Sequence, residues 1–163
     1  MSDEGLVATG SQTVGPFFHL GLANHAAPMT ADVEGNRIRL TIAVTDGDGV
    51  PVPDAMLELW QRDGDTGICG FTRVSTGEDG TCEIETARTD HINVCFFSRG
   101  LLRQLYTRIY FESESGLETD PVLRLVPPER RATLMARRGG PDTRQWRFSL
   151  RLQGADETVF FDV

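Results

Sequence analysis

From residue 37 onward, apolar side chains recur at every second position of the chain. The first such segment covers residues 37–45, and segments with the same period span residues 56–60, 91–96, 105–111 and 146–152. Successive side chains of a β-strand point to opposite faces, so a period of two is typical of a strand with one buried face. The pattern therefore predicts a series of half-buried strands.

Short clusters of Asp and Gly separate the alternating segments, at residues 46–49, 63–65 and 78–80. Both residue types tolerate the left-handed backbone conformation of tight turns, so we expect these clusters to close hairpins. They lack the residue order of an EF-hand calcium loop. Closely spaced strands with such turns predict an all-β fold, namely an antiparallel β-sandwich.

Two segments depart from this pattern. Proline and an acid at residues 127–129, followed by cations and glycines at residues 137–140, predict one short helix over residues 128–138. Residues 1–36 show no period and form an irregular N-terminal arm, which carries the apolar residues Phe17 and Phe18. Because an arm cannot bury these rings in a sheet, we expect them to pack against this domain or against a partner.

Composition narrows the class of protein further. A length of 163 residues without a linker or repeat predicts a single domain over residues 1–163. The formal net charge of -8 argues against nucleic-acid binding, and every basic residue is Arg because the chain contains no Lys. No apolar run has the length of a membrane span, and acids near the start argue against a signal peptide. Three cysteines without paired spacing, Cys69, Cys82 and Cys95, favour a reducing cytoplasm.

The histidines offer only part of a metal site. His91 and Asn93 share one strand face, as two neighbouring metal ligands would, but the second position is an amide. His19 and His25 lie in the arm. His91 also follows Asp90, yet no nucleophile motif accompanies this pair. A structural histidine is the simpler interpretation.

Four segments, in chain order, carry a family pattern. They are residues 11–22 (SQTVGPFFHLGL), residues 57–61 (LELWQ), residues 91–111 with HIN, FSRG and TRIYF, and residues 153–162 with QG and ETVFFD. Together they resemble the alpha chains of protocatechuate 3,4-dioxygenases, which belong to the intradiol ring-cleavage family. Relative to typical alpha chains, this sequence is shorter around residues 24–37 and 62–90.

This resemblance implies a β-sandwich that pairs with a beta chain of the same fold, with non-haem Fe(3+) held by two Tyr and two His of the beta chain. Here the H-x-H motif of the beta chain reads His91-Ile92-Asn93, and the stretch at residues 85–90 contains no Tyr. The two tyrosines, Tyr106 and Tyr110, lie on one later strand. Ferric iron prefers hard anionic oxygen donors together with imidazole, so we expect no metal ligand and no catalytic residue in this chain alone.

The resemblance also implies a reaction, in which O2 and 3,4-dihydroxybenzoate give 3-carboxy-cis,cis-muconate by opening the ring between its two hydroxyl-bearing carbons. We expect Arg99 to extend a cation toward the aromatic acid. The residues expected to line the mouth of the shared pocket are Thr13, Gly15 and Pro16. Phe17 and Phe18 become candidate anchors for the beta chain.

Two alternatives remain open from the sequence. The chain could be a non-enzymatic β-sandwich binding module descended from this family. It could also be a self-sufficient metalloenzyme that uses His91 with Tyr106 or Tyr110. Iron content of the isolated chain and uptake of a beta chain would separate the three interpretations.

Overall fold

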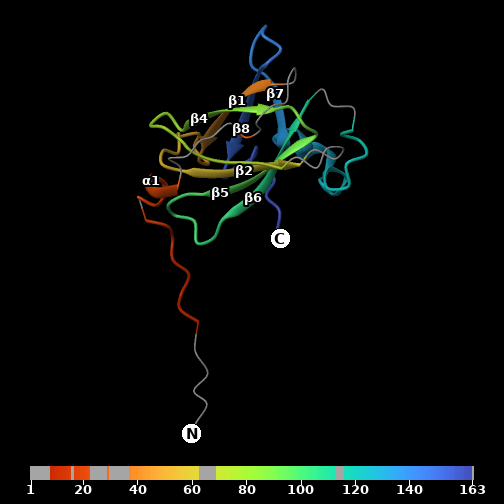
Figure 1. Ribbon diagram of the computed structural model, residues 1–163. Helices are drawn as coiled ribbons and strands as arrows, with labels where there is room; N and C mark the ends of the chain where they lie inside the picture. The colour runs from red at the N-terminus through yellow and green to blue at the C-terminus, as the bar shows by residue number, and fades with distance from the viewer. Residues whose placement is uncertain are drawn as a thin grey trace.

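The strands of the computed structural model form two stacked layers (Figure 1). The structure describes residues 8–15, 17–22, 29, 37–62, 69–112 and 116–162. In this part of the chain the strands are β1 (Arg37–Thr45), β2 (Met56–Arg62), β3 (Cys69–Ser75), β4 (Thr81–Ala87), β5 (His91–Phe97), β6 (Leu105–Phe111), β7 (Met135–Arg138) and β8 (Gln145–Arg151). The helices are α1 (Phe18–Leu22), and the 3-10 helices η1 (Leu123–Leu125) and η2 (Pro128–Leu134).

One layer holds β3, β2, β5 and β6, and the other holds β7, β8, β1 and β4, in that order. A short pairing of β6 with β7 joins the two layers at one edge. The predicted all-β sandwich is confirmed, and so are the strands predicted near residues 37–45, 56–60, 91–96, 105–111 and 146–152. The pairing is not uniformly antiparallel, because β1 runs parallel to β8 and β6 runs parallel to β7.

The core lies between the inner faces of the two layers. Every second side chain of β1 points inward, and Leu40, Ile42 and Val44 have no exposed surface. The ring of Trp146 on β8 meets Phe111 on β6 edge to face, with 5.2 Å between the ring centroids. Contact between the layers therefore depends on the period-two pattern seen in the sequence.

A smaller apolar cluster covers part of the outer face of β6. Tyr110 is 1% exposed although it alternates with the core residues Ile109 and Phe111. The segment over residues 116–134 folds back across it and contributes Leu123, Val126 and Leu134. Tyr110 is thus buried on the face of β6 that the alternation assigned to solvent.

The predicted helix over residues 128–138 is wrong in its second half. The structure has the 3-10 helix η2 at residues 128–134, followed by strand β7. Pro128 and Glu129 begin η2 as the sequence suggested, but Ala136 is buried while Arg137 is exposed, which is a strand pattern. The cations expected to stabilise a helix end instead line a strand. Within the described ranges, the α-helix of the chain is α1, inside the predicted arm.

The Asp/Gly clusters behave differently from one another. Asp46 accepts hydrogen bonds from the backbone N–H groups of Asp48 and Val50, at 2.9 Å each, and closes a turn at the end of β1 as expected. The cluster at residues 78–80 joins β3 to β4, which do not pair with each other, so the hairpin predicted there is wrong. Residues 63–65 lie outside the described residues.

Among the described residues, no helix is long and apolar enough to cross a membrane.

Gly80 provides a test of the turn between β3 and β4. Its φ is +70°, and a Cβ there would lie 2.7 Å from the backbone oxygen of Val44 and 2.9 Å from the backbone nitrogen of Val52. Gly49 has a similar φ of +81°, but a Cβ there would meet no atom within 4 Å. We expect Gly49→Ala to cost about 1–2 kcal/mol of unfolding free energy from backbone strain alone, and Gly80→Ala to cost more. Urea unfolding of both variants checks this, and equal losses would contradict the steric argument.

Candidate functional site at the arm and the β5–β6 turn

A tight turn after β5 presents Arg99. The N–H of Leu101 donates to the carbonyl of Ser98 over 3.3 Å, and Gly100 has a φ of +87°. A glycine with positive φ at the third position of a four-residue turn is typical of a type II turn, which leaves the second residue, Arg99, at the tip. Ser98 is buried, whereas the Arg99 side chain is 51% exposed.

The N-terminal arm reaches this turn. Thr13 Oγ1 accepts a hydrogen bond of 2.8 Å from the N–H of Gly100, across 87 residues of sequence. The arm also contributes Gln12 and Val14 to a shallow pocket of about 150 Å³ next to Leu101 and Leu102. Two segments that were expected to line one pocket mouth therefore meet in the folded chain.

Arg99 is held by a weak ion pair. Its Nη2 lies 3.5 Å from Asp54 Oδ2, and the Asp54 side chain is 40% exposed. Pairs as exposed as this one are worth about 0–1 kcal/mol. The guanidinium can therefore leave Asp54 at low cost when a better anion is present. Local sequence patterns do not reveal Asp54, because the contact joins two turns far apart in the chain.

The other predicted lining residues are less constrained. Gly15 is exposed, and its carbonyl accepts a 3.3 Å hydrogen bond from the N–H of Phe18 at the start of α1. Pro16 lies outside the described residues. Phe17 is 73% exposed and Leu20 is 52% exposed, so the arm keeps apolar surface in contact with solvent.

The face of β5 and β6 around His91 carries a charged network. Asn93 and Arg108 are directly opposite each other in the β5–β6 ladder, and Arg108 Nε donates to Asn93 Oδ1 over 3.1 Å. Arg108 Nη1 also lies 3.4 Å from the hydroxyl of Tyr110 and 3.9 Å from Asp120 Oδ2. The guanidinium thus bridges an amide, a phenol and a carboxylate.

Asp120 fixes the other end of this network. Its Oδ1 accepts hydrogen bonds from the Tyr110 hydroxyl at 2.9 Å and from the backbone N–H of Leu123 at 2.7 Å. Burial alone would raise the pKa of Asp120, but these hydrogen bonds and the charge of Arg108 outweigh it and lower the pKa. Burial raises the pKa of Tyr110 to about 12. The pair is therefore a neutral phenol that donates to a carboxylate.

His91 sits at the edge of the same network. Its ring centroid is 5.7 Å from that of Tyr110, and its Nδ1 is buried without a hydrogen-bond partner in the described structure. Burial and the charge of Arg108 lower its pKa, against opposing contributions from Asp120 and Asp90. Burial raises the pKa of Cys82 to about 12 and that of Cys95 to about 11, so both side chains are neutral thiols near pH 7.

Comparison with known proteins identifies the family. The chain is 41% identical to the protocatechuate 3,4-dioxygenase alpha chain of Burkholderia cepacia, over 97% of this chain and 98% of that one. It is 36% identical to the corresponding alpha chain of Pseudomonas putida, over 99% and 100% of the two chains. This chain belongs to the protocatechuate 3,4-dioxygenase alpha-chain family. No protein-family model matches the sequence.

A solved structure shows a similar fold. The dioxygenase domain of a dioxygenase and carbohydrate-binding protein fusion from Streptomyces sp. SirexAA-E superposes with a TM-score of 0.63 and 25% sequence identity. The match covers 90% of this chain and 99% of that chain. The resemblance drawn from the sequence segments is confirmed.

Intradiol dioxygenases imply Fe(3+), and the residues around His91 in this alpha-chain family member do not fit it. Asn93 offers an amide where the family resemblance implies a second histidine, and Arg108 brings a positive charge against the oxygen atoms of Asn93 and Tyr110. No group of three or more His, Cys, Asp or Glu within the described ranges is arranged to hold a metal ion. A fixed guanidinium repels a ferric ion and competes for the same oxygen donors.

His91 should make the stability of this alpha-chain family member depend on pH. In the unfolded chain it titrates near its ordinary value of about 6.5, whereas burial lowers its pKa in the fold. The stability that His91 contributes by staying neutral in the fold is therefore fully present above about pH 6.5. It is lost as the pH falls below about 6.5 toward the lowered pKa of the folded state. We expect the free energy of unfolding to decrease between pH 7 and pH 5, with a slope from His91 of at most about 1.4 kcal/mol per pH unit.

Urea unfolding of the wild type and of His91→Gln across that range measures the effect. The substitution should flatten the slope between pH 7 and pH 5 while leaving the dependence above pH 7 unchanged. Parallel curves for the two proteins would show that His91 takes up its proton equally in the folded and unfolded states.

Proposed function

We propose that this chain is the non-metal-binding subunit of a hetero-oligomeric intradiol dioxygenase, in which it completes the active site of a protocatechuate 3,4-dioxygenase beta chain. The Fe(3+) is held by that beta chain and supplies the activation of the catecholate toward O2. The reaction inserts both atoms of O2 and converts 3,4-dihydroxybenzoate to 3-carboxy-cis,cis-muconate. The sequence identity of 41% and 36% to two alpha chains, over nearly the whole sequence, supports this proposal over a non-enzymatic module.

The observation that carries the proposal is the hydrogen bond between Thr13 and Gly100. It holds Thr13 of the arm against the turn that bears Arg99, which supports a pocket mouth shared by the arm and this turn. Gly15 follows Thr13 by two residues, and its carbonyl accepts a hydrogen bond from the N–H of Phe18. A partner that covers this junction would enclose the Arg99 side chain with its own surface.

Arg99 binds the substrate carboxylate in this proposal. A charged hydrogen bond in a partly desolvated site is worth about 1.5–3 kcal/mol, which exceeds the worth of the exposed pair with Asp54. Exchange of Asp54 for the carboxylate of the substrate is therefore favourable. The guanidinium stays charged at any working pH and offers a planar fork that matches a carboxylate.

The exposed apolar residues of the arm provide the contact with the beta chain. Phe17 and Leu20 on and beside α1, together with Leu102 on the β5–β6 turn, leave apolar surface uncovered at this end of the molecule. Permanent hetero-complexes bury such surface, because its removal from water drives association.

We further propose that the chain is one domain over residues 1–163 and acts in the cytoplasm, as its buried free cysteines Cys82 and Cys95 favour.

Substitution of Arg99 should change the preference between two catechols. In the reconstituted complex we expect Arg99→Ala to lower kcat/KM for protocatechuate by about tenfold to a hundredfold and to leave catechol nearly unaffected. Arg99→Lys keeps the charge but loses the fork, so it should recover part of the activity. The measurement is kcat/KM for both substrates with wild type and both variants, at equal iron content.

Thr13 supplies the control for this experiment. Thr13→Val removes the acceptor for the Gly100 N–H and should reduce activity on protocatechuate, whereas Thr13→Ser retains that acceptor and should not. If Arg99→Ala lowers kcat/KM equally on both substrates, Arg99 has a structural role. If it lowers neither, Arg99 faces solvent in the complex.

Iron content distinguishes this function from a self-sufficient metalloenzyme. We expect the isolated chain to bind no stoichiometric Fe(3+). The oxygen atoms near His91 that could act as metal ligands instead accept hydrogen bonds from Arg108. The complex with the beta chain should contain iron and show the visible absorption of tyrosinate bound to ferric iron. Metal analysis and absorption spectra of both samples check this, and one tightly bound ferric ion per isolated chain would overturn it.

A further inference from the structure

A groove with excess positive charge crosses the outer face of the layer that contains β7, β8 and β1. It has a volume of about 640 Å³, and its charged lining consists of four arginines and two acids. The arginines are Arg137, Arg138, Arg147 and Arg151, and the acids are Glu129 and Asp156. This concentration of positive charge stands out in a chain whose formal net charge is -8.

Two of these arginines face each other. Arg137 on β7 and Arg147 on β8 are directly opposite in the antiparallel ladder, and both are exposed. Like charges at directly opposite positions of a sheet destabilise it. Within the described residues, neither Arg137 nor Arg147 has an acidic side chain within 4.0 Å. In the described structure the fold therefore holds these two cations together without an ion pair to either of them.

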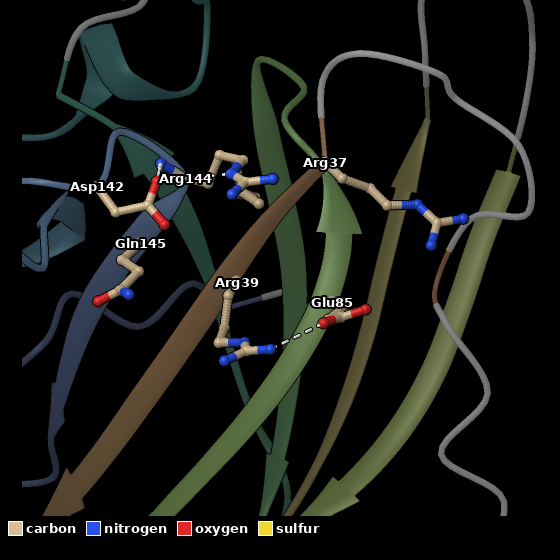
Figure 2. A pocket seen from close by; sticks show the side chains of 7 residues that line it. Arg37, Arg39, Glu85, Asp142, Arg144 and Gln145 are labelled. Atoms are coloured by element: carbon tan, nitrogen blue, oxygen red, sulfur yellow. Dashed lines mark hydrogen bonds and ion pairs between the residues drawn. The ribbon is translucent and has the colours of Figure 1, made fainter.

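The pocket at the neighbouring end of the same strands shows the opposite arrangement. Figure 2 shows Arg39 on β1 reaching toward Glu85, and Arg144 lying beside Asp142. Arg39 is 3.1 Å from Glu85 and 3.2 Å from Glu83, and Arg144 is 3.5 Å from Asp142. Two exposed arginines of this pocket, Arg39 and Arg144, are thus paired with acids, whereas Arg137 and Arg147 in the groove are not.

Arg151 extends the groove along β8. It lies on the same face as Arg147, four residues further on, which corresponds to about 13 Å along a strand. Its guanidinium is oriented by the carbonyl oxygens of Gly47 at 2.8 Å and Gln153 at 3.2 Å. Between the two arginines, Ala43 and Ser149 are small and leave an open floor.

We infer that this groove binds an extended acidic segment of a neighbouring polypeptide in the dioxygenase assembly. Carboxylates four residues apart on an extended segment are also about 13 Å apart, so they can reach the Arg137–Arg147 pair and Arg151 together. Arg favours such pairs because its fork binds carboxylates in a bidentate manner. The open, elongated surface suits a polypeptide segment, since small-molecule sites are enclosed and mostly apolar.

The inference rests on the proposed function, because the neighbouring polypeptide belongs to the complex formed with the beta chain. The experiment compares the double variant Arg137→Gln/Arg147→Gln with Arg37→Gln/Arg124→Gln, each in complex with the beta chain. The control pair removes the same charge from exposed arginines that line neither the groove nor the arm junction. Sedimentation velocity at 50 mM and 500 mM NaCl gives the mass of the assembly, and kcat/KM is measured on the same samples.

We expect the wild type and the control to form assemblies of more than one alpha–beta pair at 50 mM NaCl and to lose mass at 500 mM NaCl, where charges are screened. The groove variant should lose at least about half of the assembly mass already at 50 mM, since a closed symmetric assembly contains two pairs or more. Arg137→Lys/Arg147→Lys should retain part of the assembly, because it keeps the charge.

Two results would overturn the inference. One is a groove variant with the same mass as the wild type at both salt concentrations. The other is a wild type that remains a single alpha–beta pair throughout. Failure of the proposed function gives a different result, namely the absence of the beta chain from every sample, including the control.

Discussion

The register of the β5–β6 ladder determines what this chain can and cannot do chemically. In this register Asn93 is opposite Arg108, and His91 is opposite Tyr110. A shift of one residue would move all these side chains to the other face of the sheet, so the buried positions Ile92, Val94 and Ile109 hold the register in place. The same ladder ends in the turn from Ser98 to Leu101, which carries Arg99. One pairing therefore places the charged network near one end of β5 and the proposed substrate cation beyond the other.

The network around Arg108 explains why the chain needs a partner. A phenol, an amide and a carboxylate converge there, which are all oxygen donors that a hard cation could use. Arg108 uses them instead, and its charge lowers the pKa of both His91 and Asp120. The positive charge is covalently attached and cannot be exchanged for iron. We therefore propose that the chain acts at the junction of the arm and the β5–β6 turn.

Much of the fold could be predicted from the sequence, because the strands that form the core have an unbroken period of two. Strand β4 is hard to predict because its inward positions are Cys82, Ile84 and Thr86, which form a weak apolar pattern. The sequence of strand β7 resembles that of a helix C-terminus, because cations followed by glycine are compatible with either structure. The contacts of Arg99 with Asp54 and of Arg108 with Asp120 join distant turns and strands, and local patterns contain no information about such pairs. Thr13 and Arg99 stand out through family resemblance rather than through their chemistry.

The partners of each arginine differ in strength, and this difference separates their roles. Arg108 contacts three oxygen-bearing side chains in a half-buried setting, so it is committed to the fold. Among the described residues, Arg99 has one exposed carboxylate partner that a better-placed anion can replace. Arg137 and Arg147 face each other on neighbouring strands with no acidic side chain to offset their repulsion in the described structure. An unbalanced pair of this kind is unfavourable in the isolated chain and becomes favourable only when an anion is present. The degree of pairing within the chain thus indicates which cations are structural and which face outward to a ligand or a partner.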